Sequence, residues 1–313
     1  MDKNSKIFVA GHRGLVGSAI LRKLQYDGYK NLLTVTRDEL DLRNQFEVDN
    51  WFKTNQPEYV FLAAAKVGGI GANSNFQADF ITENLQIQTN VIQNSYRNNC
   101  KKLLFLGSNC IYPKFAQQPI KEEYLLTDSL EPTNIGYAIA KISGVLMCEK
   151  YYEQYEFNAI SLMPCNLYGI NDNFNIDSGH VLPSLIAKFV NAKEQKIPNV
   201  ICWGDGSPKR EFLISDDLAD AAIFVMKSDL NFDILNIGTD NDISIKELAE
   251  IIKKQVGYEG EIIWDTSKPN GTPRKKLDTT KMDALGWKSK ISLEEGLKLT
   301  IDWYLNNRTY GRF

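Results

Sequence analysis

Short apolar runs alternate with longer segments in which apolar residues recur at helical spacing through the first half of the chain. Apolar runs bounded by turn residues predict buried strands, and the longer amphipathic segments predict helices. Strands are expected at Ile7–Ala10, Leu32–Thr36, Tyr59–Ala63, Lys102–Leu106 and Ala159–Met163. Helices are expected between them at Leu15–Tyr26, Gln45–Thr54, Phe76–Asn98 and Tyr137–Gln154. This alternation is typical of a parallel sheet covered by helices.

The regular alternation ends after Pro164. Residues Gly169–Gly179 are rich in Asn, Asp and Gly, which favours a loop. Further helices are expected at Pro183–Lys193, Ser215–Met226, Ser244–Gln255 and Leu293–Asn306, and further strands at Val200–Trp203, Leu235–Ile237 and Glu261–Trp264. The whole pattern predicts an α/β protein: a Rossmann-type doubly wound parallel sheet with a smaller mixed α/β domain.

The composition narrows the functional classes. The length of 313 residues supports two domains, because one hydrophobic core stops growing at about 250–300 residues. A net charge of −3 gives no support for binding to nucleic acid or to a membrane surface. Five cysteines without CxxC spacing argue against a disulfide framework and against a metal site. A polar N-terminus and the lack of a long apolar run lead us to expect a cytoplasmic protein.

A glycine-rich turn follows the first expected strand and opens the first expected helix. It consists of Gly11, His12, Arg13, Gly14, Leu15, Val16 and Gly17. Glycine lets the backbone turn tightly and approach a pyrophosphate, and the helix N-terminus offers free N–H groups to it. A tight turn without a ligand is the plainer alternative, but the strand–turn–helix context favours a dinucleotide site.

The second strand bears on which dinucleotide binds. NAD sites usually carry an acidic residue about twenty positions further on, to bind the ribose 2′-hydroxyl. Here Arg37 occupies that place and Arg13 lies in the glycine turn, although Asp38 and Asp41 follow closely. Two guanidinium groups suit a 2′-phosphate, so NADP(H) is the expected cofactor. We expect residues 1–168, with about 212–237, to bind it, and residues 169–211 and 238–313 to bind the substrate.

A reductive group of three residues is expected at the carboxyl edge of the sheet. Tyr137 and Lys141 are four residues apart at the start of a helix, so both side chains lie on one face. Lys141 is expected to lower the pKa of the Tyr137 phenol and make it a proton donor. Ser108 follows the fourth strand, where its hydroxyl can bind a ketone oxygen. A YxxxK spacing alone arises by chance, but these three residues together favour function.

These residues resemble the extended short-chain dehydrogenase/reductase family, and more narrowly its GDP-L-fucose synthases, which epimerise and reduce GDP-4-keto-6-deoxymannose. The resemblance covers nearly the whole chain. The matching segments are Ala10–Ala19, Leu62–Ile70, Leu104–Pro113, Glu131–Asn134, Tyr137–Lys141, Asn166–Gly169, Trp203–Gly206, Arg210–Leu213 and Gly271–Lys275.

The resemblance implies a division of chemical roles. Ser108, Tyr137 and Lys141 would carry reduction at C4 of the sugar, and Cys110 and His180 would epimerise C3 and C5 as base and acid. A C4 ketone acidifies the neighbouring C–H bonds, and a thiol and an imidazole have ordinary pKa values near neutrality. The plainer alternatives are a buried apolar cysteine and a surface histidine.

The resemblance also implies binding residues and an assembly. The cofactor would contact the glycine turn, Arg37, Leu106, Gly107, Ser108, Asn109, Lys141, Pro164, Asn166, Leu167 and His180. The GDP-linked 4-keto sugar would contact Lys188, Trp203, Arg210 and Asn270. Members of this family form homodimers through helices that correspond to Phe76–Asn98 and Tyr137–Gln154, so a homodimer is expected, although an apolar helical stripe is more often internal core.

Several departures from the family pattern fall on the substrate side. They are Asn109, Gly136, Cys165, Asn270 and the loop Asn171–Ser178. They leave the sugar open: a C4 reductase acting on a related GDP-4-keto hexose or heptose after a separate epimerase is the main alternative. Ser108-Asn109-Cys110 in place of Thr-Asp-Glu disfavours a dehydratase. A nucleotide-sugar 4-epimerase and a non-catalytic NADP-sensing protein are weaker alternatives.

Overall fold

In the computed structural model, which describes residues 1–268 and 270–308, six parallel strands form the main sheet in the order β2-β1-β3-β4-β5-β9. The strands are β1 (Ile7–Ala10), β2 (Leu32–Leu33), β3 (Tyr59–Leu62), β4 (Lys102–Leu106), β5 (Ala159–Pro164) and β9 (Asp233–Ile237). Every residue of β1, β4 and β5 is buried, as expected for a parallel sheet covered on both faces. The predicted Rossmann-type fold is confirmed.

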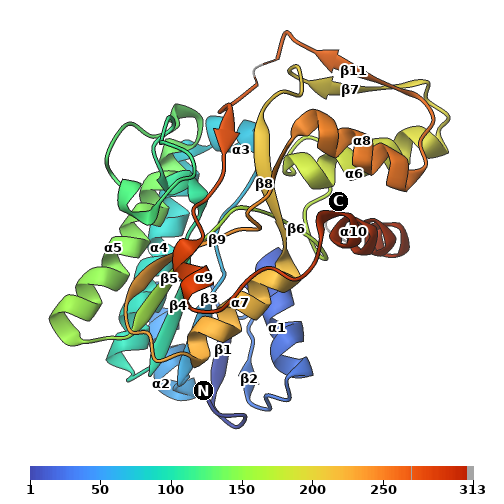
Figure 1. Ribbon diagram of the computed structural model, residues 1–313. Coiled ribbons are helices and arrows are strands. Elements are labelled where there is room, and N and C mark those ends of the chain that lie inside the picture. The colour runs from blue at the N-terminus through green and yellow to red at the C-terminus, as the bar shows by residue number, and fades with distance from the viewer. Residues whose placement is uncertain (269, 309–313) are drawn as a thin grey trace.

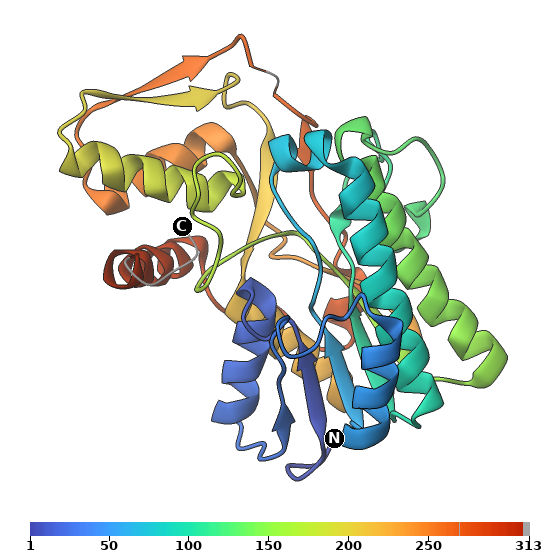
Figure 2. The same ribbon diagram turned by 180° about the vertical axis from the view of Figure 1, so that it is seen from behind.

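Helices cover both faces of this sheet (Figures 1 and 2). On one face α1 (Leu15–Tyr26) packs against α7 (Ser215–Lys227), in which several alanines are buried. On the other face α4 (Gln77–Arg97) packs against α2 (Gln45–Asn55) and α5 (Ile135–Tyr155). We call the six-stranded sheet with these helices the sheet lobe.

A second core lies above the carboxyl edge of the sheet, in the part we call the cap lobe (Figure 1). Its central strand β8 (Lys209–Ile214) pairs with three short strands. A separate parallel pair joins β7 to β11. The cap-lobe elements are β6 (Asn166–Tyr168), β7 (Asn199–Trp203), β10 (Asp242–Ser244), β11 (Glu261–Asp265), β12 (Arg274–Lys275), α6 (Val181–Glu194), α8 (Ile245–Val256) and α10 (Leu293–Asn307).

The sequence pattern missed the short elements. It predicted β2 as far as Thr36, but the strand ends at Leu33. It did not predict α3 (Ile70–Asn75), α9 (Thr280–Ala284), the short strands β6, β10 and β12, or the three 3-10 helices Asn109–Ile111, Glu122–Tyr124 and Pro132–Asn134. Elements of two to six residues are too short to show a hydrophobic period. It also missed β8, which begins with the charged residues Lys209, Arg210 and Glu211.

The chain crosses between the two lobes several times. After β5 it enters β6, whose partner is β8 of the cap lobe. Later, Leu277, Met282 and Trp287 pack into the core of the sheet lobe, and α9 contacts β9. The two lobes are therefore interleaved in sequence, and the predicted domain boundaries stay a proposal.

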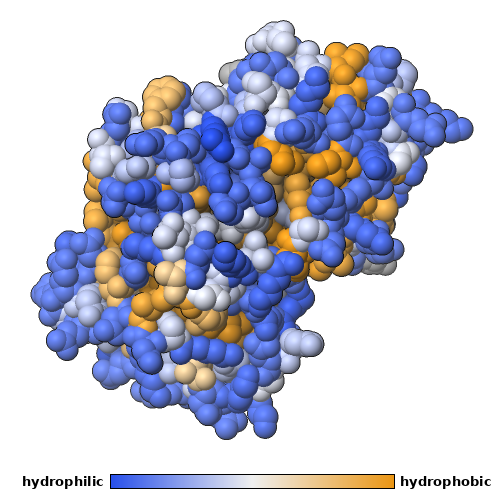
Figure 3. Space-filling view, viewed as in Figure 1, coloured by the Kyte–Doolittle hydropathy of each residue, from blue (hydrophilic) through white to orange (hydrophobic). Residues whose placement is uncertain are grey.

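The surface seen in Figure 3 is mostly hydrophilic, and apolar residues gather in a few patches between the hydrophilic ones. A folded protein ordinarily exposes a substantial share of apolar surface. Within residues 1–268 and 270–308, the helices are too short or too polar to cross a membrane.

Candidate active site

The glycine turn is sterically required at its two ends. Gly11 has a φ of +84°, and a Cβ there would lie 2.7 Å from the backbone nitrogen of Ala64, just beyond β3. A Cβ on Gly17 would lie 2.1 Å from the Gly11 carbonyl oxygen. At Gly14 a Cβ would come no closer than 3.5 Å to the same oxygen. The turn therefore lies between β1 and β3, where the strand order reverses and where such sheets bind their ligands.

This turn fits a dinucleotide. Gly14 is the N-cap residue of α1, and no described side chain caps the helix there. The first N–H groups of α1, which a helix cannot satisfy internally, are thus left for an anion. Next to them, Nδ1 of His12 is buried without a hydrogen-bond partner in the described part of the chain. Burial and the nearby Arg13 lower the pKa of His12.

The two arginines predicted to bind a 2′-phosphate lie at the surface. Arg13 is exposed, and the side chain of Arg37 is 66% exposed with its guanidinium 3.8 Å from the Glu83 carboxylate. Glu39 lies close by, but one of its carboxylate oxygens accepts bonds from both the N–H and the hydroxyl of Thr36, at 2.8 Å each. That carboxylate is tied to the turn after β2, whereas the arginines remain available to a ligand.

Ser108, Tyr137 and Lys141 come together at the end of β4. The Ser108 side chain lies close enough to the Tyr137 phenol to lower its pKa. Lys141 is 4% exposed and donates a 2.7 Å hydrogen bond to the carbonyl oxygen of Leu106, the last residue of β4. Its ammonium lies 5.8 Å from the centre of the Tyr137 ring. The helix predicted to begin at Tyr137 starts two residues earlier, so both side chains leave the first two turns of α5.

The pKa values at this group differ from the sequence prediction. Lys141 was expected to lower the pKa of Tyr137, but enclosure by the protein raises it, with a smaller rise from Cys110. Burial lowers the pKa of Lys141 to about 7. The physical reason is desolvation, which disfavours the phenolate and the ammonium alike. A raised pKa keeps the phenol protonated at neutral pH, and the protonated form is the one that can donate.

Cys110 is half-buried in the 3-10 helix beside Ser108. The Ser108 hydroxyl accepts a 3.2 Å hydrogen bond from the Cys110 N–H, which fixes the start of this short helix. The Asn134 side-chain amide donates to the Cys110 sulfur at 3.3 Å. Cys110 influences the pKa of both Tyr137 and Arg210, so its sulfur lies near both side chains.

His180 reaches the carboxyl edge of the sheet on the loop before α6. The N–H of Gly69, just after β3, donates to the Ser178 carbonyl at 3.1 Å, and this ties the loop to the sheet lobe. A Cβ on Gly69 would lie 2.6 Å from the Gly179 carbonyl, so the two segments are in close contact. The His180 side chain is exposed, yet the surrounding protein lowers its pKa by desolvation. This combination is typical of a side chain that lines a recess.

The other residues expected at the cofactor form the floor of this edge. Leu106 ends β4 and Gly107 follows it, and a Cβ on Gly107 would lie 2.2 Å from the Met163 side chain. Pro164 ends β5, and Leu167 lies in β6. Asn166 between them donates to the carbonyl of Glu211 in β8 at 3.0 Å, so this segment joins the two lobes.

The residues expected at the substrate gather around the end of β7 in the cap lobe. Lys188 of α6 donates to the Ile201 carbonyl at 3.1 Å, and Trp203 at the end of β7 is 62% exposed. The Asn270 side-chain oxygen accepts from the Asp205 N–H at 2.9 Å, which holds the turn after Trp203. Arg210 of β8 lies within 3.7 Å of the Cβ position of Gly271.

The structure therefore joins two predicted groups. Arg210 belongs to the cap-lobe cluster and also lies near Cys110 of the sheet lobe. Burial lowers the pKa of its guanidinium, and Cys110 opposes this shift. Figure 1 shows β8 running down from the cap lobe toward the main sheet. The arrangement places a guanidinium group of the cap lobe close to Cys110 of the sheet lobe.

Sequence reasoning missed three residues that hold this site together. Glu211 is fully buried and accepts hydrogen bonds from the N–H groups of Thr239 and Asp240, at 2.7 Å each, and from Leu277, at 3.1 Å. It thereby anchors β8 beside Arg210. The other two are Asn134, which contacts Cys110, and Gln77 of α4, which accepts from the N–H of Gly136. All three act through long-range contacts that leave no local pattern.

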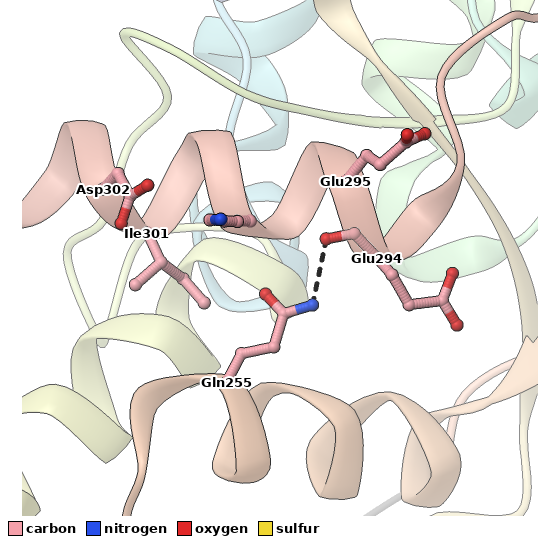
Figure 4. Close-up of a pocket in the computed structure, with 6 residues that line it drawn as sticks. Gln255, Glu294, Glu295, Ile301 and Asp302 are labelled. Atoms are coloured by element: carbon pink, nitrogen blue, oxygen red, sulfur yellow. Dashed lines mark hydrogen bonds between the residues drawn. The ribbon is translucent and has the colours of Figure 1, made fainter.

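A separate groove lies between α8 and α10, away from these residues (Figure 4). It has a volume of about 460 Å³, and Gln255 spans it by donating to the Glu294 carbonyl at 2.9 Å. Its charged lining is mostly acidic and consists of Glu294, Glu295 and Asp302. Lys298 is the one cation among its described lining residues. An acidic lining does not suit a phosphorylated ligand, so this groove is not the site described above.

Residues 7–238 match the model of the NAD dependent epimerase/dehydratase family. The chain belongs to this family. It is 57% identical over 306 residues to GDP-L-fucose synthase 1 of Arabidopsis thaliana. This alignment covers 98% of this chain and 95% of that protein. It is 49% identical over 312 residues to GDP-L-fucose synthase of Escherichia coli, covering 97% of each.

A solved structure adds a second kind of relative. A GDP-mannoheptose C4 reductase from Campylobacter jejuni, with NADP bound, is 45% identical to this chain. The two structures superpose with a TM-score of 0.89 and cover 97% of this chain and 99% of that one. The similarity thus extends over both lobes.

Proposed function

We propose that this chain is an NADPH-dependent enzyme that reduces the C4 ketone of a GDP-linked 4-keto-6-deoxy sugar and epimerises C3 and C5. The observation that carries the proposal is the group at the end of β4: Ser108 lies close to the Tyr137 phenol, and the buried Lys141 places its ammonium 5.8 Å from the Tyr137 ring. Two close relatives are GDP-L-fucose synthases, and a third with NADP bound reduces C4 of a GDP-heptose.

NADPH fits the glycine turn, where Gly11, Gly14 and Gly17 leave space for a pyrophosphate against α1. Arg13 and Arg37 would hold the 2′-phosphate by charge-assisted hydrogen bonds. The segments 106–109 and 164–167, with Lys141 and His180, would line the nicotinamide half. When bound, NADPH supplies the hydride for the reduction.

The residues of the chain then handle the proton. The Ser108 hydroxyl binds the ketone oxygen and holds it against the Tyr137 phenol. Tyr137, kept protonated by its raised pKa, gives its proton to that oxygen as the alcohol forms. Lys141 stabilises the resulting phenolate with its ammonium, which the Leu106 carbonyl holds in place.

Epimerisation would use the half-buried Cys110 and the exposed His180. The Cys110 thiolate takes a proton from C3 or C5, and the C–H electron pair moves toward the C4 oxygen to form an enolate. His180 returns a proton to the opposite face of the same carbon. Lys188, Trp203, Arg210 and Asn270 would hold the GDP part, with Arg210 on the diphosphate.

The test is a reaction of the purified protein with NADPH and GDP-4-keto-6-deoxymannose in deuterated water, with the product identified by NMR. We expect a C4 alcohol that carries deuterium at C3 and C5. Cys110→Ser should lose the deuterium at both carbons. Undiminished exchange in this variant would exclude the role of Cys110.

The second candidate is a C4 reductase alone, acting on a related GDP-4-keto hexose or heptose. It is favoured by the similarity to the GDP-mannoheptose C4 reductase and by the substitutions Asn109, Gly136, Cys165 and Asn270 on the substrate side. In the same experiment this candidate predicts a C4 alcohol without deuterium at C3 or C5. A deuterated product excludes it.

We further propose a homodimer in the cytoplasm that binds neither nucleic acid nor membrane. Tyr96 of α4 and Tyr155 of α5 stack at 4.5 Å, and Tyr155 is exposed on the outer side of this helix pair, where a second copy would cover it. All five cysteines are free, which suits a reducing compartment. Sedimentation as a monomer at micromolar concentrations would contradict the dimer.

A further inference from the structure

Asn134 occupies the N-cap position of α5 but does not cap the helix. Asparagine at this position usually accepts a hydrogen bond from the first helical turn, and its side chain makes no such bond here. Instead, Gln77 of α4 accepts a 3.2 Å hydrogen bond from the N–H of Gly136. The cap is thus supplied by another helix, and the Asn134 side chain is turned away from α5.

Asn134 donates its side-chain N–H to the sulfur of Cys110, at 3.3 Å. On the other side, the side-chain oxygen of Asn109 accepts from the Cys110 thiol at 3.8 Å. The other ends of both amides, Oδ1 of Asn134 and Nδ2 of Asn109, are buried and have no hydrogen-bond partner among the described residues. Half-satisfied buried amides are costly, so their retention around one sulfur calls for a reason beyond stability.

We propose that Asn134 is a positioning residue for Cys110, and that its donated hydrogen bond holds the sulfur in place and favours the thiolate over the thiol. This inference rests on the proposed function, in which the thiolate removes a proton from the sugar. A hydrogen bond donated to a charged acceptor is about twice as strong as one between neutral groups, so the bond stabilises the deprotonated form more than the thiol.

Loss of the thiol proton changes what Asn109 can offer. Its oxygen, which accepts from the thiol, would face a sulfur that has nothing to donate. A half-turn of the amide about its last bond brings Nδ2 to the sulfur instead, and this nitrogen leaves no partner behind. Asn109 can therefore serve both protonation states, whereas Asn134 favours the thiolate. Among the described residues, Tyr137 of α5 and Arg210 of β8 lie close enough to this sulfur for Cys110 to affect their pKa values, and both remain unchanged in the test below.

The test measures how fast iodoacetamide alkylates Cys110 as a function of pH, without substrate or cofactor. The other four cysteines are buried, so the reaction reports on Cys110, and Cys110→Ser provides the background rate. In Asn134→Ala we expect the midpoint of the pH–rate profile to rise by about one unit, which lowers the rate at neutral pH about tenfold. Asn134→Asp keeps the shape but adds a negative charge, so its midpoint should rise further.

Gln77→Ala is the matched control. It removes the cap of α5 from the same region and should lower the melting temperature, but it should leave the alkylation midpoint of Cys110 unchanged. An unchanged midpoint in both Asn134 variants, or an equal shift in Gln77→Ala, overturns the proposal. Because this readout needs no sugar, it stays separate from the proposed function, which the deuterium exchange of Cys110→Ser tests independently.

Discussion

The sheet lobe and the cap lobe hold their functional residues in different ways. In the sheet lobe, Lys141 is 4% exposed and bonded to a strand carbonyl, and glycines are forced by backbone contacts of less than 3 Å. In the cap lobe, Trp203 is 62% exposed, Lys188 donates to a backbone carbonyl and Asn270 accepts from a backbone N–H. Buried side chains with fixed partners, as in the sheet lobe, can be replaced only at a cost in stability. Exposed side chains, as in the cap lobe, can change with little cost to the fold.

This difference accounts for part of where the chain departs from its family pattern. Asn270 and the loop 171–178 belong to the cap side, whereas Asn109 and Cys165 are buried at the carboxyl edge of the sheet. Gly136 is a departure in the sheet lobe, and the neighbouring Gln77 explains it. A Cβ at this position would lie 2.6 Å from the Gln77 carbonyl oxygen, and a proline would have no N–H to donate to the Gln77 side chain. The comparison predicts that substitutions at the end of β4 strongly reduce activity, and that substitutions near β7 reduce it only slightly.

The largest effect is expected from Tyr137→Phe. Loss of the proton donor should lower the rate of NADPH oxidation with a 4-keto sugar by about a hundred- to ten-thousand-fold. The ring and its edge-on contact with Phe80 are kept, so NADPH should bind as in the wild type when followed by fluorescence. Brisk residual reduction would exclude Tyr137 as the donor.

The glycine turn offers a pair of matched variants. Gly17→Ala places a Cβ 2.1 Å from the Gly11 carbonyl oxygen, so we expect loss of measurable NADPH binding and a decrease of about 1–3 kcal/mol in the free energy of unfolding. Gly14→Ala, whose Cβ has 3.5 Å of space, should keep the free energy of unfolding of the wild type, although the same Cβ enters the space left for the pyrophosphate and should weaken NADPH binding. Calorimetric titration and urea unfolding provide the measurements, and an equal loss of stability in the two variants would contradict the geometry.

The choice of cofactor is tested by Arg37→Ala. Loss of a charge-assisted hydrogen bond to the 2′-phosphate, worth about 1.5–3 kcal/mol, should weaken NADPH binding roughly ten- to hundredfold. NADH lacks this phosphate, so its affinity should change little. If both dinucleotides weaken equally, Arg37 does not select between them.

The pH dependence of reduction should follow Lys141, whose pKa burial lowers to about 7. Below this value the side chain carries the ammonium that stabilises the phenolate, and above it the charge is lost. The rate under saturating substrate should therefore decrease as pH rises above about 7, approaching tenfold per unit. Lys141→Arg keeps its charge, so this decrease should disappear even if the rate is lower throughout.

The smallest effect is expected at Asn270. Asn270→Ala removes the acceptor for the Asp205 N–H, a bond worth about 1 kcal/mol, and should raise KM for the GDP-sugar roughly fivefold without changing kcat. Asn270→Asp keeps the acceptor and should bind nearly as well as the wild type. A decrease in kcat for either variant would place Asn270 closer to the chemistry than the structure indicates.

Much of the fold and of the site could be predicted because the signals were local. The strand β1, the glycine turn and α1 follow one another within twenty residues, and Tyr137 and Lys141 share one helix face through their spacing alone. The short strands of the cap lobe were missed because two to six residues carry too little periodicity. The raised pKa of Tyr137 was missed because enclosure depends on residues from several elements.

The sequence by itself determined the parallel sheet and the strand–turn–helix unit at the glycine turn, and it made Ser108, Tyr137 and Lys141 the candidate residues, since each of these signals lies in a short stretch of the chain. Only the tertiary structure shows that Arg210 lies near Cys110 and that Asn134 donates to the sulfur of Cys110. It also shows that Gln77 of α4 caps α5. Those contacts join residues up to about a hundred positions apart. Their geometry depends on how the two lobes pack, which no short stretch of sequence specifies.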